Sequence, residues 1–130
     1  MTDADEAPGA RTTPLRGRTL LVVEDNYVLA RELCVRLASE GAGIIGPAAT
    51  VDAALDLLGD GPLPSCAVLD INLRGQMAWP VADALLTRRI PLVFVSGYGA
   101  EAIPRAYARI PRCEKPVDLH QLVRLLVATA

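Results

Sequence analysis

Side chains that could act together chemically stand at the ends of apolar runs in this 130-residue chain. The run Cys66–Leu69 leads into Asp70, and the run Thr19–Val23 leads into Glu24 and Asp25. A continuous apolar run without polar alternation is typical of a strand buried on both faces of a parallel sheet. Ligands bind at the carboxyl edge of such a sheet. An isolated Asp at a strand end is usually only the cap of a turn, so the other strand ends decide its meaning.

A hydroxyl and an amine follow two further runs. Ser96 follows Leu92–Val95, and Lys115 follows a weaker strand predicted over Arg109–Cys113. If the first and third strands are neighbours, the carboxylates converge and repel by roughly 4 kcal/mol per close pair at an effective dielectric near 20. The lysine and a Mg²⁺ ion held by oxygen ligands would offset that repulsion. Such a set of groups is what a phosphorylatable aspartate needs, because phosphoryl transfer depends mainly on electrostatic stabilisation.

The elements that position these groups alternate between strand and helix five times. The pattern predicts a doubly wound, flavodoxin-like (βα)5 fold: a five-stranded parallel sheet of order 2-1-3-4-5 with helices on both faces. The predicted strands cover 19–23, 42–46, 66–70, 92–95 and 109–113, and the predicted helices cover about 27–40, 51–58, 80–88, 100–107 and 119–126. Thr50 and Asp118 are the expected caps of the second and last helices. We expect 74–78 to be a loop, and the fourth helix to be short or irregular because Pro104 removes a backbone donor.

Composition limits the domain organisation and the function classes. Residues 1–17, rich in Ala, Thr, Pro and Asp, are predicted to be a flexible tail, followed by one domain over 18–130. The net charge of −2 offers no basic surface for nucleic acid, and no apolar run is long enough to cross a membrane. Three cysteines within apolar runs predict reduced thiols and a cytoplasmic location.

Four ordered blocks resemble the signature of the receiver domains of two-component response regulators, the CheY-like superfamily. These blocks are Leu21–Asn26, Leu69–Leu73, Val95–Tyr98 and Glu114–Pro116. The resemblance covers about Arg18 to Ala130, and any one block alone would be a weak signal. The segment Phe94–Gly99 is also similar to the Phe-Ala-Thr-Gly-Tyr variant of alphaproteobacterial receivers.

The resemblance implies a role for each residue. Asp70 is expected to be the phosphoacceptor, which takes its phosphoryl group from a sensor histidine kinase or a histidine phosphotransfer protein. The implied Mg²⁺ ligands are Glu24, Asp25, Asp70 and the backbone carbonyl of Asn72, with Asp25 the more direct ligand of the acidic pair. Ser96 matches the switch hydroxyl, and Lys115 matches the phosphoryl-binding lysine.

One position departs from the family. Three residues before the lysine, where relatives usually carry an aromatic residue, this chain has Arg112. A guanidinium does not bury cheaply, so an inward swing of a ring on phosphorylation is not expected here. The switch residues that we predict are Ser96, Tyr98 and Arg112, together with the segment interrupted by Pro104.

The expected function is that of a single-domain response regulator without a DNA-binding output domain, because the last predicted helix ends at the carboxyl terminus. It would signal by protein contacts or phosphorelay, through the face formed by the fourth helix, fifth strand and fifth helix. Arg105, Arg109 and Arg112 would make that face basic and suited to acidic partners. A homodimer through the same face stays open. Self-catalysed phosphotransfer of this kind is not enzymatic turnover in the usual sense.

Three other functions compete with this interpretation. A haloacid-dehalogenase-type phosphatase wants a second Asp two residues after the first, where this chain has Asn72. A nucleotide- or flavin-binding module wants glycines and free amides after the first strand, where Glu24 and Asp25 would repel a phosphate. A degenerate receiver that acts as an unphosphorylated docking module remains the alternative, because of Arg112.

Overall fold

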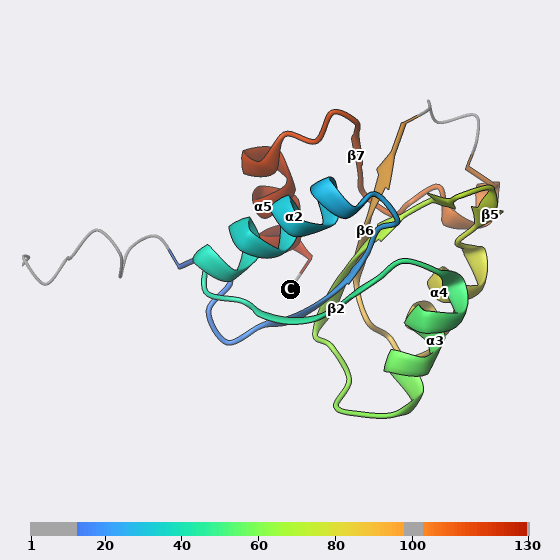
Figure 1. The fold of residues 1–130 in the computed structure, drawn as a ribbon, viewed down its shortest axis with the longest axis horizontal. Coiled ribbons are helices and arrows are strands. Elements are labelled where there is room, and N and C mark those ends of the chain that lie inside the picture. Colours follow the sequence, from blue (N-terminus) through green and yellow to red (C-terminus); the bar gives the residue numbers. More distant parts are fainter. Residues whose placement is uncertain (1–12, 98–102, 130) are drawn as a thin grey trace, which may run out of the picture.

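Five parallel strands form the sheet at the centre of the molecule (Figure 1). The computed structural model describes residues 13–97 and 103–129. The strands of the sheet are β1 (Thr19–Val23), β2 (Gly43–Ala48), β3 (Cys66–Asp70), β6 (Leu92–Ser96) and β7 (Arg112–Glu114). Their order is β2-β1-β3-β6-β7, and all neighbours are parallel. Because β6 and β7 are the fourth and fifth strands of this sheet, the predicted 2-1-3-4-5 order is confirmed.

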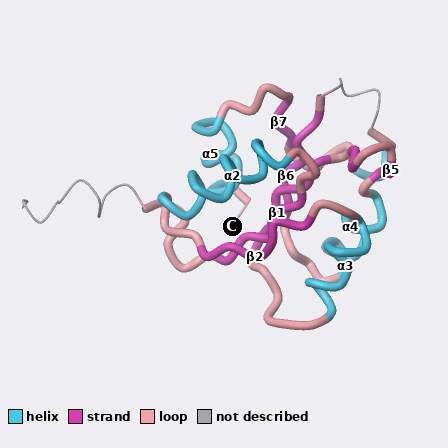
Figure 2. Tube along the Cα trace, in the orientation of Figure 1, coloured by secondary structure: helices cyan, strands magenta, loops and turns pink. Residues whose placement is uncertain are grey.

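Within the described residues, helices α2 (Tyr27–Ser39) and α5 (Leu119–Ala128) cover one face of the sheet and α3 (Val51–Gly59) and α4 (Trp79–Thr87) the other, as Figure 1 and Figure 2 show. Parallel strands need crossover connections, and right-handed crossovers carry the helices to both faces. The carboxyl ends of all five strands therefore meet at one edge of the sheet.

The inner strands are buried on both faces, which explains their continuous apolar sequences. In β1, Leu20 and Val22 belong to the core beneath α2 and α5, whereas Leu21 and Val23 belong to the core beneath α3 and α4. Every residue of β3 and β6 is buried. Because both faces are covered, a one-residue slip of register would not expose apolar side chains to solvent. It would instead move the strand ends, and the side chains that follow them, away from their partners.

Side-chain caps fix where three helices begin. Each cap accepts a hydrogen bond from the backbone N–H three residues later; the caps are Asn26 for α2, Thr50 for α3 and Asp118 for α5. The predicted caps Thr50 and Asp118 are thus confirmed. The longest helix of the described ranges, α2, has 13 residues, and no helix there has the length and apolar character needed to cross a bilayer.

A small hairpin replaces part of the loop predicted after β3. Its strands, β4 (Asn72–Leu73) and β5 (Gln76–Met77), are antiparallel and are joined by Arg74 and Gly75. Both turn residues have positive φ, 57° and 92°, which is the backbone of a type I′ turn. Strands of two residues are too short to produce a hydrophobic period, so the sequence pattern did not predict them.

The predicted fourth helix is short in its described part. Within 103–107 the chain forms only a single 3₁₀ turn, η2 (Arg105–Tyr107), because Pro104 is extended, with ψ at 151°. Residues 98–102, with Tyr98, lie outside the described residues. The fifth strand of the sheet begins at Arg112, three residues later than predicted, because turns with bonds such as Ile110 N–H to the Tyr107 carbonyl occupy 105–110.

The packed structure includes part of the segment that the sequence assigns to the tail. Leu15 is fully buried in the core beneath α2 and α5. Its backbone N–H donates to the carbonyl of Glu40, at 2.9 Å. The described domain therefore extends to residues before Arg18, where the sequence pattern places its start, while residues 1–12 lie outside the described residues.

Candidate functional site

Three carboxylates meet at the carboxyl ends of β1 and β3. Glu24 and Asp25 directly follow β1, and Asp70 is the last residue of β3. The two strands are paired in register up to Val23 and Leu69, so the side chains that follow lie side by side. One oxygen of each carboxylate lies within 4.8 Å of the others. Glu24 and Asp70 are buried, and Asp25 is half-buried. We call Glu24, Asp25 and Asp70 the acidic cluster.

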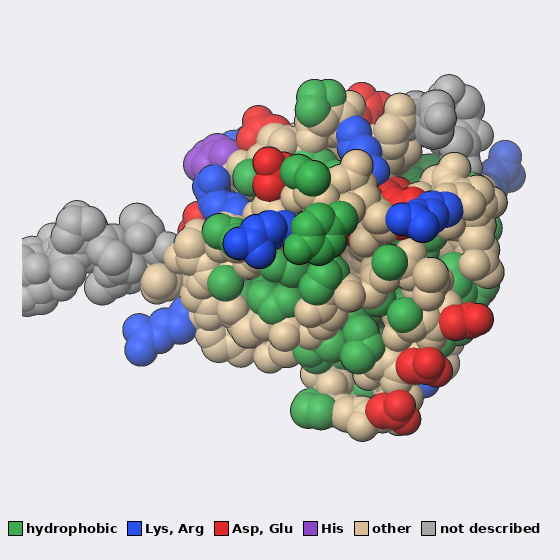
Figure 3. All heavy atoms as spheres, in the orientation of Figure 1, with side chains coloured by type: hydrophobic (Ala, Val, Ile, Leu, Met, Phe, Trp, Pro, Cys, Tyr) green, Lys and Arg blue, Asp and Glu red, His purple; other side chains and the backbone are tan. Residues whose placement is uncertain are grey.

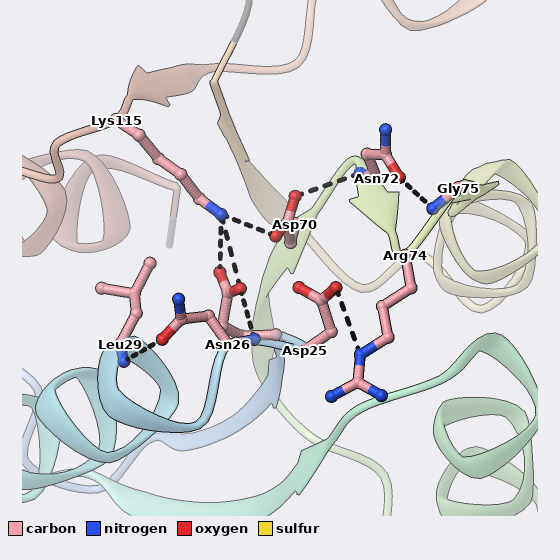
Figure 4. A network of polar contacts seen from close by, with 9 residues as sticks. Asp25, Asn26, Leu29, Asp70, Asn72, Arg74, Gly75 and Lys115 are labelled. Carbon is pink, nitrogen blue, oxygen red and sulfur yellow. Dashed lines mark hydrogen bonds and ion pairs between the residues drawn. The ribbon is translucent and has the colours of Figure 1, made fainter.

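Lys115 supplies a positive charge to the acidic cluster (Figure 4). Its Nζ lies 2.8 Å from Asp70 Oδ2 and 3.4 Å from both oxygens of Glu24. Burial is the largest influence on the pKa of this amine and lowers it, but the hydrogen bond and charges of the two carboxylates together raise the pKa above its usual value. Lys115 is also the only lysine in the chain.

The backbone near the sheet edge holds Lys115 in place. Its N–H donates to the Ser96 carbonyl at 2.8 Å, which continues the pairing of β7 with β6 beyond Glu114. The peptide bond between Lys115 and Pro116 is cis. The side chain therefore starts at the carboxyl end of the edge strand and reaches across β6 to the acidic cluster.

The carboxyl of Glu24 is buried in surroundings that disfavour its negative charge. Its Oε2 accepts a hydrogen bond from the backbone N–H of Asn26 at 3.0 Å, whereas Oε1 is buried without a hydrogen-bond partner. Burial is the main cause that raises the pKa of this carboxyl to about 7, and the neighbouring charge of Asp70 adds to the effect. A buried acceptor without a donor is costly, so this oxygen is suited to a further cationic partner.

Hydrogen bonds also orient Asp70 and tie it to the hairpin. The backbone N–H of Asn72 donates to Asp70 Oδ1 at 3.0 Å, and the Asn72 side-chain oxygen accepts from the Gly75 N–H at 2.6 Å. Lys115 therefore holds one oxygen of Asp70, and the chain after β3 holds the other. The carboxylate plane is fixed from both sides.

An open cavity of about 660 Å³ lies above these groups. Residues from four strand ends line it, among them Asp25, Asp70, Ser96 and Lys115. Ser96 ends β6 and is buried, with Glu114 as its partner in register on β7. The structure thus brings together the carboxylates, the hydroxyl-bearing residue and the amine that the sequence predicted at one sheet edge.

Comparisons with known proteins agree with this geometry. A comparison with models of protein families finds no match, and neither does a comparison with curated proteins. SdrG from Sphingomonas melonis Fr1 is 33% identical, with a TM-score of 0.76, over 86% of this chain and 95% of SdrG. The signal receiver domain of a modulated diguanylate cyclase from Desulfovibrio desulfuricans G20 is 27% identical, with a TM-score of 0.69, over 86% and 92% of the two chains. The chain belongs to the receiver domains of response regulators.

A longer response regulator has the same fold in one part. PhyR from Brucella abortus has a TM-score of 0.76 at 22% identity, and the match covers 97% of this receiver domain. It covers only 54% of PhyR, so this chain spans about half the length of that protein. These neighbours are signalling domains rather than metabolic enzymes. The family therefore indicates a signalling domain here too.

The acidic cluster of this receiver domain fits a hard divalent cation. All of its donors are oxygens, which is the ligand type that Mg²⁺ prefers. The buried Oε1 of Glu24, which has an ion pair with Lys115 but no hydrogen-bond partner, is an acceptor that a cation or its water would satisfy. Lys115 contacts only Glu24 and Asp70 among the three carboxylates, which leaves room for a further positive charge. The role of the Asn72 backbone carbonyl as a metal ligand is untested and stays a prediction.

Of the predicted switch residues, Ser96 lines the cavity beside Asp25 and Asp70. Tyr98 lies outside the described residues. Arg112 is half-buried on the edge strand β7, opposite Phe94, and does not line the cavity. Its role in a switch is untested and stays a prediction.

Sequence reasoning missed one cation of the site. The Nε of Arg74 lies 3.9 Å from Asp25 Oδ2, at the rim of the cavity. The signal for it was the Arg74-Gly75 pair four residues after Asp70, since a Gly in a two-residue turn permits the hairpin that carries Arg74.

Proposed function

We propose that this receiver domain accepts a phosphoryl group on Asp70 from a phosphohistidine of a sensor histidine kinase or histidine phosphotransfer protein. The observation that carries the proposal is the 2.8 Å contact between Lys115 Nζ and Asp70 Oδ2, beside a cavity that Asp25 also lines and within one cluster with Glu24. A lone structural aspartate would not need a half-buried lysine and two further acids beside it.

In the proposed step, a carboxylate oxygen of Asp70 attacks the phosphorus atom. A new oxygen–phosphorus bond forms, and the phosphorus–nitrogen bond to the donor histidine breaks, with its electron pair going to the imidazole. Lys115, which stays protonated because its pKa is raised, balances the charge on the phosphoryl oxygens. Ser96, at the end of β6, offers its hydroxyl to one of those oxygens.

Glu24, Asp25 and Asp70 would hold Mg²⁺ through their oxygens, together with the Asn72 carbonyl. The bound ion supplies the positive charge that neutralises the incoming phosphoryl group. The chain itself keeps the three acids close enough to share one cation, through the register of β1 with β3 and the cap at Asn26.

An apolar surface of this receiver domain lies beside the cavity, and the partner kinase would dock on it. Asn26 lines the cavity and caps α2, and the next two residues, Tyr27 and Val28, have exposed fractions of 78% and 65%. Val35, seven residues after Val28, continues this apolar surface two turns along α2. Figure 3 shows hydrophobic side chains gathered over α2 and β2 on this face. An apolar patch that adjoins a reactive site favours a protein donor.

Output would use a second surface, on the opposite edge of the sheet. Arg105 and Arg109 are exposed and Arg112 is half-buried, all after the loop that follows β6. Phosphorylation would bias this segment through Ser96, and the arginines would meet an acidic partner or a second copy. Charge reversal of Arg105 and Arg109 together should abolish such binding, and unchanged affinity would contradict this surface.

The decisive experiment is incubation with acetyl phosphate and Mg²⁺, read by intact-protein mass spectrometry. The wild type should gain one phosphoryl group, Asp70→Asn should gain none, and chelation of Mg²⁺ should abolish the gain. Asp56→Asn, at an exposed position of α3, is the matched control and should behave as the wild type. Absence of any gain with acetyl phosphate and with phosphorylated histidine kinases would favour the unphosphorylated docking module.

A further inference from the structure

The hairpin β4–β5 carries a second cation to the acidic cluster. In Figure 4, Arg74 extends from the hairpin toward Asp25, on the side of the cluster away from Lys115. The Nε to Oδ2 distance is 3.9 Å, and 79% of the Arg74 side chain is exposed. Lys115 contacts Asp70 and Glu24 at shorter range, so the two cations divide the three carboxylates between them.

The position of Arg74 is fixed by backbone structure rather than by its own contact. Arg74 adopts a left-handed conformation, with φ at 57°, which a non-glycine residue rarely does without a reason. Asn72 pairs with Met77 across the hairpin, and the Asn72 side chain also accepts from the Gly75 N–H. Leu73 is buried in the core beneath α3 and α4. The hairpin is therefore anchored to the domain while its turn residue stays in solvent.

We propose that Arg74 is a displaceable counter-ion of the acidic cluster: it neutralises Asp25 in the metal-free protein and turns to the phosphoryl donor when Asp25 becomes a metal ligand. This inference rests on the proposed phosphoacceptor function. A long contact of an exposed guanidinium is weak and easily broken. A guanidinium released at the rim of the cavity matches the planar arrangement of two phosphoryl oxygens.

The two roles predict opposite effects of removing the side chain. Without Arg74, Asp25 has one competitor fewer, so Arg74→Ala should bind Mg²⁺ more tightly by roughly two- to fivefold at low ionic strength. The difference should shrink at high salt, because the pair is exposed. At saturating Mg²⁺ the same variant should be phosphorylated by acetyl phosphate more slowly, by roughly two- to tenfold, because the donor loses a charged partner.

The experiment measures both quantities on the full chain. Mg²⁺ affinity is determined by NMR titration of backbone amides with the metal alone, and the initial rate of phosphorylation is determined by mass spectrometry with acetyl phosphate. Arg74→Lys should restore part of the rate, because it keeps the charge without the planar fork. Arg124→Ala is the control, since it removes the same charge from an exposed position on α5, a helix that does not line the cavity.

An Arg74→Ala variant with the affinity of the wild type for Mg²⁺, or with its rate at saturating Mg²⁺, would overturn the proposal. The same shift in Arg124→Ala would also overturn it, because the effect would then follow net charge alone. If the proposed function is wrong, the wild type itself will gain no phosphoryl group. The Mg²⁺ affinities of the wild type and Arg74→Ala will still show whether Arg74 competes with the metal for Asp25.

Discussion

Trp79 stacks on Tyr107, with ring centroids 4.9 Å apart and ring planes within 9° of parallel. Phe94 of β6 meets both rings edge-on. The Tyr107 hydroxyl also donates a 2.6 Å hydrogen bond to Asp83 of α4. One tyrosine thus attaches the 3₁₀ turn η2 to α4, the helix that follows the hairpin β4–β5.

The hydrogen bond of Tyr107 can be separated from its stacking. Tyr107→Phe keeps the ring and loses the bond to Asp83, so we expect the free energy of unfolding to fall by about 1 kcal/mol. Tyr107→Ala also loses the aromatic contacts and should cost about 3 kcal/mol or more. Urea unfolding measures both. Tyr27→Phe, at a position 78% exposed, is the control and should change little; a loss equal to that of Tyr107→Phe would contradict the assignment.

The same hydrogen bond makes stability depend on alkaline pH. Donation to Asp83, followed by burial, raises the pKa of Tyr107 to about 12 from a usual value of 10. A group with a raised folded-state pKa stabilises the fold fully below its unfolded pKa and loses this contribution as pH rises through the folded value. The stability difference between wild type and Tyr107→Phe should therefore be constant below pH 10 and shrink from pH 10 through about 12. A difference that grows over that range would refute the linkage.

Removal of the lysine should expose the repulsion within the acidic cluster. Lys115→Ala leaves the buried carboxylates of Glu24 and Asp70 without their cation, so we expect a loss of about 1–3 kcal/mol in the free energy of unfolding with a chelator present. The 29% exposure of the lysine side chain keeps the figure below that of a fully buried pair. Arg36→Ala, which breaks a half-buried pair with Glu40 one turn further along, at the end of α2, should cost less than about 1 kcal/mol. Equal losses would mean that Lys115 is not balancing the acids.

The segment before β1 belongs to the folded domain, and one leucine tests this. Leu15 is fully buried, so Leu15→Ala should lower the free energy of unfolding by about 2–5 kcal/mol. Leu63→Ala, at a position 51% exposed, is the matched control with a much smaller expected change. If both variants unfold at the urea concentration of the wild type, Leu15 contributes nothing to the core.

The sequence predicted the sheet edge well because the relevant residues sit at the ends of long apolar runs. The runs before Glu24 and Asp70 specify two inner strands, and parallel pairing of inner strands leaves few ways to place the residues that follow them. The caps Thr50 and Asp118 were readable because capping needs one side chain and one amide three residues later. These parts of the fold depend on local patterns alone.

The features that the sequence did not predict depend on tertiary contacts. Leu15 lies in a stretch whose composition is typical of a tail, and only its contact with the core reveals the larger domain. The hairpin around Arg74 has strands too short for any period, and the relation of Arg74 to Asp25 arises because the chain folds back after β3. No pattern within one segment contains that information.

Lysine occurs once in this protein, and the fold has placed it against Asp70 and Glu24 of the acidic cluster. Every other cationic side chain except the single histidine is an arginine. Selective isotope labelling of lysine would consequently yield one ammonium resonance in the entire spectrum. That resonance would register ions, phosphorus and docking proteins alike, so the molecule carries its own spectroscopic reporter where its signalling chemistry is proposed to take place.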